Sequence, residues 1–216
     1  ARSSRKSTED EAWKDSGLEL NVAETVFKGY ETLSANSNVL AVIAHGELAE
    51  TAAEGEKVIA ILDETPFYAE GGGQVTDTGF ISNDDFAARG ESVEKKDGVF
   101  YHTATITKGE LKVGASAFAM VDVAKRHCTA RNHTATHLLQ KALRKVIGTH
   151  VEQAGSSVNE KVLRFDFSHF EAVTKEQLAE VEKMVNDVIN EFLVVDTKEM
   201  SMAEAQEAGA MALFGE

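Results

Sequence analysis

The sequence predicts an α+β fold in which a small β-barrel-like N-terminal part is followed by a two-layer α+β domain. Short runs rich in β-branched and aromatic residues, separated by glycine-containing turns, occupy residues 39–123 and are typical of a small barrel. Beyond them the spacing of apolar residues changes to three and four, which indicates amphipathic helices. We therefore expect a polar tail or helix at 1–20, a barrel with a glycine-rich loop at 21–125, and the α+β domain at 126–216.

The strands of the first part are expected at four short runs bounded by turn residues. These runs are 39–44, 57–62, 98–106 and 117–123. The second part should open with a helix from about residue 124 to Ile147, because its apolar residues form one stripe and Gly148 follows. Leu163, Phe165 and Phe167 then alternate as they would along one face of a strand.

Two capping boxes, at 174–177 and 201–204, predict the starts of two further helices. The first helix carries its apolar stripe over 178–192, and the second is shorter and ends near Gly209. Between them, residues 193–197 are expected to form a strand because they are rich in β-branched residues.

The composition is that of an ordinary globular protein, with 43% hydrophobic and 27% charged residues. No apolar run is long enough to span a bilayer, and the single cysteine, Cys128, favours a reducing, cytoplasmic compartment. The net charge of −14 is opposite to that of a protein that binds phosphates over its whole surface. Six basic residues near the first helix could form a local patch or a solvated helix face. They are Lys125, Arg126, Arg131, Lys141, Arg144 and Lys145.

His133 and His137 lie four residues apart on the first predicted helix, so their side chains share one face. Two imidazoles at this spacing can bind one Zn²⁺. The spacing is equally compatible with two surface histidines that bind no metal. We place both in the first turns, where the helix dipole favours neutral imidazole, with Asn132 as the N-cap and the apolar stripe opposite. The pattern does not match that of a zincin metalloprotease, because no carboxylate stands between the histidines.

Three successive glycines in residues 67–74 allow peptide N–H groups to approach a ligand, or simply form a flexible turn. Neither a P-loop lysine nor a dinucleotide-binding spacing accompanies them. Residues 151–157 are expected to form a loop, in which Gln153 could present its amide to a ligand or only cover the surface.

Five segments, in this order, resemble the alanyl-tRNA synthetases of bacteria. They are Phe-Tyr-Ala-Glu-Gly-Gly-Gly-Gln at 67–74, Asn-His-Thr-Ala-Thr-His-Leu-Leu at 132–139, Val-x-Gln-x-Gly-Ser at 151–156, Leu-Arg-Phe-Asp-Phe-Ser-His at 163–169 and Gly-Ala-Met-Ala-Leu-Phe-Gly-Glu at 209–216. The similarity runs from about residue 18 to Glu216. The half that contains the histidines is also similar to free-standing alanyl-tRNA editing proteins and to the editing domain of threonyl-tRNA synthetase.

The resemblance implies that 126–216 is an editing domain, which in the intact enzyme hydrolyses tRNA(Ala) mischarged with serine or glycine. Such a second, hydrolytic selection step is needed because a binding pocket alone discriminates poorly between amino acids of nearly the same size and shape. The resemblance also implies that His133 and His137 are zinc ligands. A Cys-x₃-His segment completes the ligand set in the family, and we expect this chain to be truncated before it.

By the same resemblance, Thr65 and Gln74 line the seryl pocket and Gln153 lies near the scissile ester. Arg131, Arg144 and Lys145 are expected to meet phosphates near the acceptor end of the tRNA. The partners would be mischarged tRNA(Ala) and the rest of the synthetase chain, whose ATP-dependent aminoacylation part is not expected here. The alternatives are a non-catalytic, RNA-contacting or interdomain scaffold with an incomplete metal site, and a self-contained editing protein.

Overall fold

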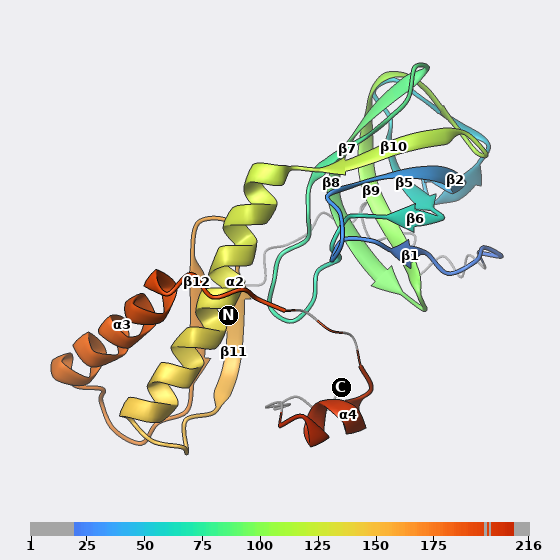
Figure 1. Cartoon of the computed structure of the whole chain (residues 1–216). Helices are drawn as coiled ribbons and strands as arrows, with labels where there is room; N and C mark the ends of the chain where they lie inside the picture. The colour runs from blue at the N-terminus through green and yellow to red at the C-terminus, as the bar shows by residue number, and fades with distance from the viewer. Residues whose placement is uncertain (1–19, 197, 199, 210–216) are drawn as a thin grey trace. The chain divides into compact units, whose positions relative to one another are not determined.

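The computed structural model describes residues 20–196, 198 and 200–209, and it divides the chain into two compact units (Figure 1). The first unit runs to Gly71 and continues with Val75–Arg126, and the second comprises Gly72–Gln74 and the residues from His127 onward. The predicted α+β class is confirmed. The N-terminal segment predicted at 1–20, except Leu20, and the motif at 209–216, except Gly209, lie outside the described residues.

The first unit is a β-barrel. Its strands are β1 (Val26–Phe27), β2 (Ser34–Ala44), β3 (Glu47–Ala49), β4 (Thr51–Ala53), β5 (Lys57–Leu62), β6 (Glu64–Thr65), β7 (Gly79–Ser82), β8 (Phe86–Lys96), β9 (Val99–Lys112) and β10 (Ser116–Val121). Within the described residues, six antiparallel strands close a ring in the order β10, β7, β8, β9, β5, β2 and back to β10. The strands β3 and β4 pair with β2 and β9, and β1 pairs with β6 in parallel.

The four strand regions predicted from β-branched and aromatic residues are confirmed as β2, β5, β9 and β10. The long strand β8 was not predicted, because most of its side chains are small or charged. Its apolar residues Phe86, Ala88 and Val93 nevertheless point inward and join the barrel core. Alternation of inward apolar and outward polar residues is what a closed antiparallel sheet requires.

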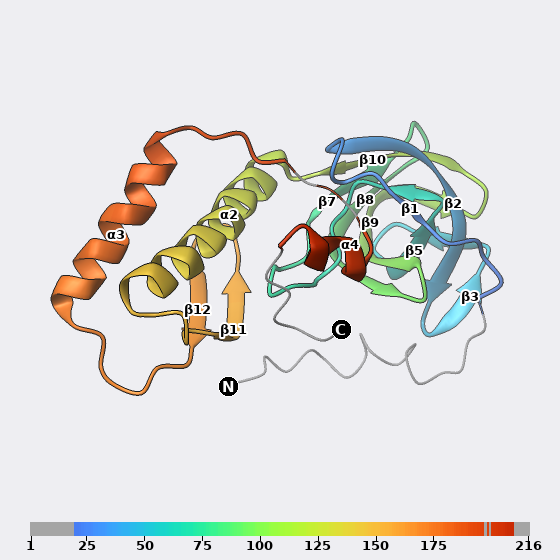
Figure 2. The same ribbon diagram turned by 60° about the horizontal axis from the view of Figure 1, so that its bottom comes forward.

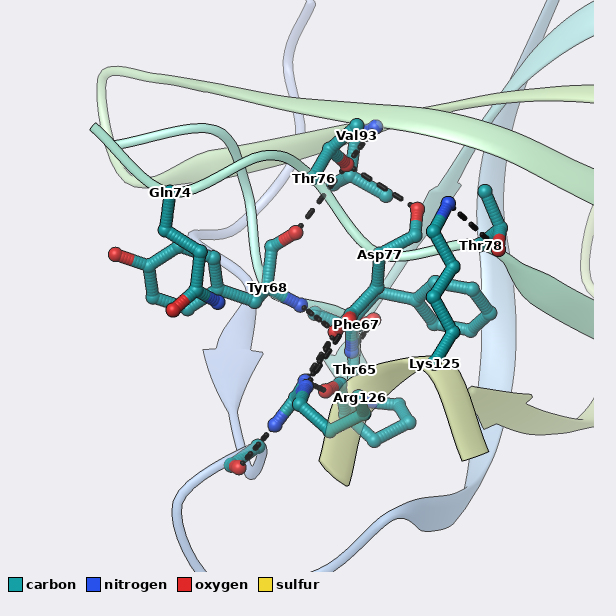
Figure 3. A network of polar contacts seen from close by, with 12 residues as sticks. Thr65, Phe67, Tyr68, Gln74, Thr76, Asp77, Thr78, Val93, Lys125 and Arg126 are labelled. Carbon is teal, nitrogen blue, oxygen red and sulfur yellow. Dashed lines mark hydrogen bonds and ion pairs between the residues drawn. The ribbon is translucent and has the colours of Figure 1, made fainter. Parts of the chain in front are cut away.

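A buried ion pair joins the barrel to the start of the helix α2 (Val123–Val146). The Arg126 guanidinium donates from Nε to both carboxylate oxygens of Asp77, at 3.0 and 2.9 Å, and also from Nη2. Nη1 also donates to the Gly29 carbonyl and Nη2 to the Pro66 carbonyl, each at 2.8 Å. Figure 3 shows the guanidinium of Arg126 directed at Asp77, with Lys125 of the same helical turn beside Thr78.

The second unit combines helices with a two-stranded antiparallel sheet. Besides most of α2, it contains β11 (Gln153–Val158), β12 (Leu163–Phe167), α3 (Lys175–Asn190) and α4 (Met202–Glu207). One apolar cluster joins α2, α3 and β12 around the buried residues Ala142, Leu143, Val151 and Val181, and Figure 2 shows these elements as neighbours. None of the helices in the described part of the chain is both long and apolar enough to cross a membrane.

Both predicted capping boxes are confirmed. Thr174 caps α3 and Ser201 caps α4, each with a reciprocal bond from the residue three positions later. The N-cap predicted for α2 was wrong. Asn132 lies inside the helix, and Asp122 takes the cap position, where its carboxylate accepts a bond of 3.0 Å from the Lys125 N–H.

Two further local expectations were wrong. Residues 193–196 form no strand, and Val194 is 94% exposed. Among the described residues no strand lies beside this segment to form hydrogen bonds with it, and β-propensity alone does not make a strand. Thr197 lies outside the described residues. Conversely, most of the segment expected as a loop at 151–157 is strand β11, which pairs with β12 despite its small polar side chains.

Replacing Arg126 with Met should destabilise the first unit by about 3–5 kcal/mol, because the buried Asp77 carboxylate loses its counter-charge. Urea unfolding followed by hydrogen exchange in β5 and β9 would measure this change. Arg89→Met is the matched control in the same unit, since it removes one partner of the largely exposed Arg89–Glu91 pair and should cost about 0.5 kcal/mol or less. Equal effects of the two substitutions would show that the buried Arg126–Asp77 pair stabilises the first unit no more than an exposed pair does.

Candidate functional site

His133 and His137 lie one turn apart near the middle of α2. Their rings are almost parallel, with an interplanar angle of 15° and a centroid separation of 5.2 Å. His133 is half-buried and His137 is exposed. The two imidazoles therefore occupy one face of the helix, as their spacing predicted, but only one of them is exposed.

Gln74 is held against this pair. Its side chain is buried, and its amide oxygen lies 2.6 Å from Nδ1 of His133. An amide oxygen can only accept a hydrogen bond, so Nδ1 of His133 must carry a proton in this contact. In the neutral imidazole the other nitrogen, Nε2, then has a free lone pair. The structure thus brings together three residues predicted separately from the glycine-rich loop and from the helix.

Burial lowers the pKa of His133 below its usual value, and the charge of His137 lowers it further. Neutral imidazole is the form that binds metals. The predicted preference for the neutral form therefore holds for His133, but the reason given from the sequence was wrong. His133 lies several turns from the N-terminus of α2, where the helix dipole has little effect, and desolvation takes its place.

Gln153 opens β11, where its amide nitrogen donates to Ser156 Oγ at 3.0 Å. Ser156 in turn packs directly against the backbone of Gly73, the residue before Gln74. Ser156 was not singled out from the sequence, although it is the last residue of the Val-x-Gln-x-Gly-Ser segment. It connects Gln153 to the glycine-rich loop.

Thr65 belongs to the first unit, where its side chain is fully buried. Nδ1 of His102 lies 3.0 Å from the Ala60 carbonyl and must donate to it, so Nε2 accepts from the Thr65 hydroxyl at 2.7 Å. The hydroxyl also accepts from the Phe67 N–H. Its proton is therefore committed to His102, a residue that the sequence did not single out, and its assignment to a seryl pocket stays a prediction.

The three predicted RNA contacts lie on α2. Arg131 and Lys145 are exposed, whereas Arg144 is half-buried and donates to the Val151 carbonyl at 2.8 Å. The Arg131 guanidinium also lies 3.0 Å from the sulfur of Cys128. Lys145 thus offers its charge most openly to a phosphate, and Arg144 has a structural partner as well.

Two imidazole nitrogens are half of the four ligands of a structural zinc site. Among the described residues, no group of three or more histidine, cysteine or acidic side chains is arranged to bind a metal. The histidine pair therefore fits zinc in donor type and protonation, and it supplies part of a ligand set.

Comparison with known proteins decides the family. The family model described as "tRNA synthetases class II (A)" matches residues 1–125, which is more than half of the chain and covers the barrel. The chain belongs to this class II tRNA synthetase family. Its similarity extends beyond the matched region into the unit that contains the histidine pair.

Several curated relatives are named alanine–tRNA ligase. The one from Alkaliphilus metalliredigens is 47% identical and the one from a Thermoanaerobacter species 46% identical, in both cases over the whole of this chain and 25% of the relative. That of Haemophilus influenzae is 45% identical over 89% of the chain and 22% of the relative. The chain thus spans about a quarter of these ligases, and the resemblance to alanyl-tRNA synthetases is confirmed.

The stability of this synthetase barrel should fall as the pH drops from about 6.5 to about 4 because of His102. Burial lowers the pKa of His102 from 6.5 to about 4, so the unfolded chain takes up a proton that the folded barrel excludes. The loss should reach about 3 kcal/mol at the acid end, since each pKa unit corresponds to about 1.4 kcal/mol.

Urea unfolding of the barrel at several pH values would measure this dependence. His102→Gln should make the decline between these pH values shallower, because glutamine does not titrate. His127→Gln, which replaces an exposed histidine, should leave the dependence as in the unmodified chain. Identical pH profiles for His102→Gln and the unmodified chain would contradict the assignment.

Proposed function

We propose that this chain is the part of an alanine–tRNA ligase that edits, and that its second unit contributes to hydrolysis of tRNA(Ala) mischarged with serine or glycine. The observation that carries the proposal is the pair His133 and His137, with Gln74 bonded to Nδ1 of His133. The resemblance of the five sequence segments to alanyl-tRNA synthetases supports it. The names of the relatives support the tRNA identity.

In the proposed site His133 and His137 would hold zinc through unprotonated ring nitrogens, together with ligands from the downstream segment that the resemblance implies. A metal-binding histidine usually donates its other N–H to an oxygen, which is the contact between His133 and Gln74. Zinc bound there would supply Lewis-acid polarisation of an ester carbonyl or of water. The half-burial of His133 lowers its pKa and so favours the neutral imidazole that a metal requires.

The reaction is hydrolysis of the ester that joins the amino acid to the terminal ribose of the tRNA. Water adds to the ester carbonyl carbon, the bond to the ribose oxygen breaks, and free serine or glycine leaves with the tRNA hydroxyl restored. Gln153, held by Ser156 on β11, would orient the ester. A site that hydrogen-bonds the serine hydroxyl discriminates against alanine, because alanine leaves that bond unmade. Thr65 belongs to the first unit, and its assignment to the seryl pocket stays a prediction from the resemblance.

Recognition of the tRNA would rest on a few cations rather than on the whole surface, given the net charge of −14. Arg131 and Lys145 on α2 are exposed and can approach phosphates, and Arg144 can do so with donors that Val151 does not engage. A non-catalytic scaffold is the second candidate. It is favoured by the incomplete ligand set among the described residues.

A chain extended through the downstream ligand segment should release serine from Ser-tRNA(Ala) and contain zinc. Replacing both His133 and His137 with alanine should lower the rate at least about tenfold and remove the metal. The matched control is His150→Ala with His169→Ala, a second contacting pair in the same unit with Nε2 and Nδ1 2.8 Å apart. Full activity after loss of His133 and His137 would exclude the editing site proposed here, and a zinc-free, inactive longer chain would favour the scaffold.

Lys145→Glu should raise the Kd of the longer chain for tRNA(Ala) several-fold and reduce the slope of log Kd against log salt by about one, since one phosphate contact is lost. Filter binding at two or more salt concentrations would measure both quantities. Lys183→Glu makes the same charge change on α3 and should have little effect. Equal weakening by both variants would show a general effect of net charge instead of a local contact.

A further inference from the structure

The glycine-rich loop is attached to β11 by its backbone. The Val158 N–H donates to the Gly73 carbonyl at 2.8 Å, and Gln74 forms an isolated parallel bridge with Val158. Residues 73 and 74 therefore lie beside β11, where the next strand of the β11–β12 sheet would be. The loop tip therefore has a fixed place in the second unit.

Only glycine fits at position 73 of this attachment. Its φ is +79°, and a Cβ there would lie 2.2 Å from Ser156 Oγ and 3.0 Å from the Ser156 carbonyl oxygen. Any larger residue would push the loop away from β11. Gly71 differs, because its φ is not positive and a Cβ would meet nothing closer than 3.7 Å. The two glycines thus form a natural pair for comparison.

The fixed loop delivers one side chain to the histidine pair. Gln74 is only 6% exposed, and the 2.6 Å contact of its oxygen with His133 Nδ1 joins residues 59 positions apart in the sequence. A buried amide that faces an imidazole fixes two things at once, namely the rotation of the ring and the nitrogen that carries the proton. With Nδ1–H as the donor, Nε2 is the free nitrogen of His133.

We propose that Gln74 is a positioning residue, delivered by the glycine-rich loop, that holds His133 in its Nδ1–H tautomer with Nε2 available as a ligand. This role differs from a place in the lining of a seryl pocket, because Gln74 acts through His133. Its consequence for hydrolysis rests on the editing function proposed above, whereas the tautomer of His133 does not.

Nitrogen-15 NMR of the histidine side chains in this chain tests the tautomer directly, at a pH of about 8 where imidazoles are neutral. The unmodified chain should show His133 as the Nδ1–H form. Gln74→Leu should lose that preference, and Gln74→Glu should restore it, since a carboxylate only accepts. Gln206→Leu, which replaces an exposed glutamine of α4, should not alter His133.

The Nε2–H form in the unmodified chain would overturn the proposal, because it would mean that the amide donates to Nδ1 and blocks the outer nitrogen. A second variant tests delivery by the loop without altering Gln74. Gly73→Ala should abolish the tautomer preference and Gly71→Ala should retain it. If both alanine variants keep the preference, the loop is not what holds Gln74 in place.

In the longer chain, Gln74→Leu should lower zinc affinity about 10–100-fold, as loss of a partner to a metal-binding histidine does, and Gln74→Glu should retain most of it. Competition with a chromogenic chelator would measure the affinity apart from activity. Altered tautomer and zinc affinity in a protein that does not hydrolyse Ser-tRNA(Ala) would refute editing and leave the positioning role intact. Unchanged zinc affinity in Gln74→Leu would refute the positioning role alone.

Discussion

The buried guanidinium of Arg126 is the interaction on which the first unit depends. It joins the first turn of α2 to Asp77 and to the carbonyls of Gly29 and Pro66, which belong to separate segments of the barrel unit. Removing two charges from water is costly, so such a pair contributes more to defining a unique arrangement than to net stability. Here the additional carbonyl contacts satisfy the guanidinium and offset part of that cost.

Asp77 extends the same constraint to the glycine-rich loop. Its carboxylate accepts from the Tyr68 N–H and its own N–H donates to the Tyr68 carbonyl, which closes the base of the loop within the first unit. The tip, residues 72–74, belongs to the second unit and is bonded to β11. The attachment of the tip to β11 lies within the second unit, and Gln74 is the side chain that this attachment places.

Some local signals predicted from the sequence proved accurate, whereas the N-cap predicted at Asn132, which is also a local signal, was wrong. The capping boxes at Thr174 and Ser201 and the four strand regions depend on neighbours within a few residues. Other failures occurred where a distant partner decides the outcome. Strand β11 exists because β12 pairs with it, and the contact of Gln74 with His133 spans 59 positions, so spacing alone could reveal the histidine pair but not its orientation.

The two histidines are not equivalent, and this asymmetry bears on how a metal could bind. Desolvation lowers the pKa of His133 and so favours its neutral form, and Gln74 is bonded to its Nδ1, whereas His137 is exposed. In the proposed metal site, a ligand fixed before binding would lose little rotational freedom, so His133 would contribute more to the affinity for the metal than its exposed neighbour. His137 can then adjust to the geometry that the other ligands impose, because one turn of helix already places it on the correct face. The buried amide of Gln74 thus orients one imidazole of a pair whose ring orientations the spacing alone does not determine.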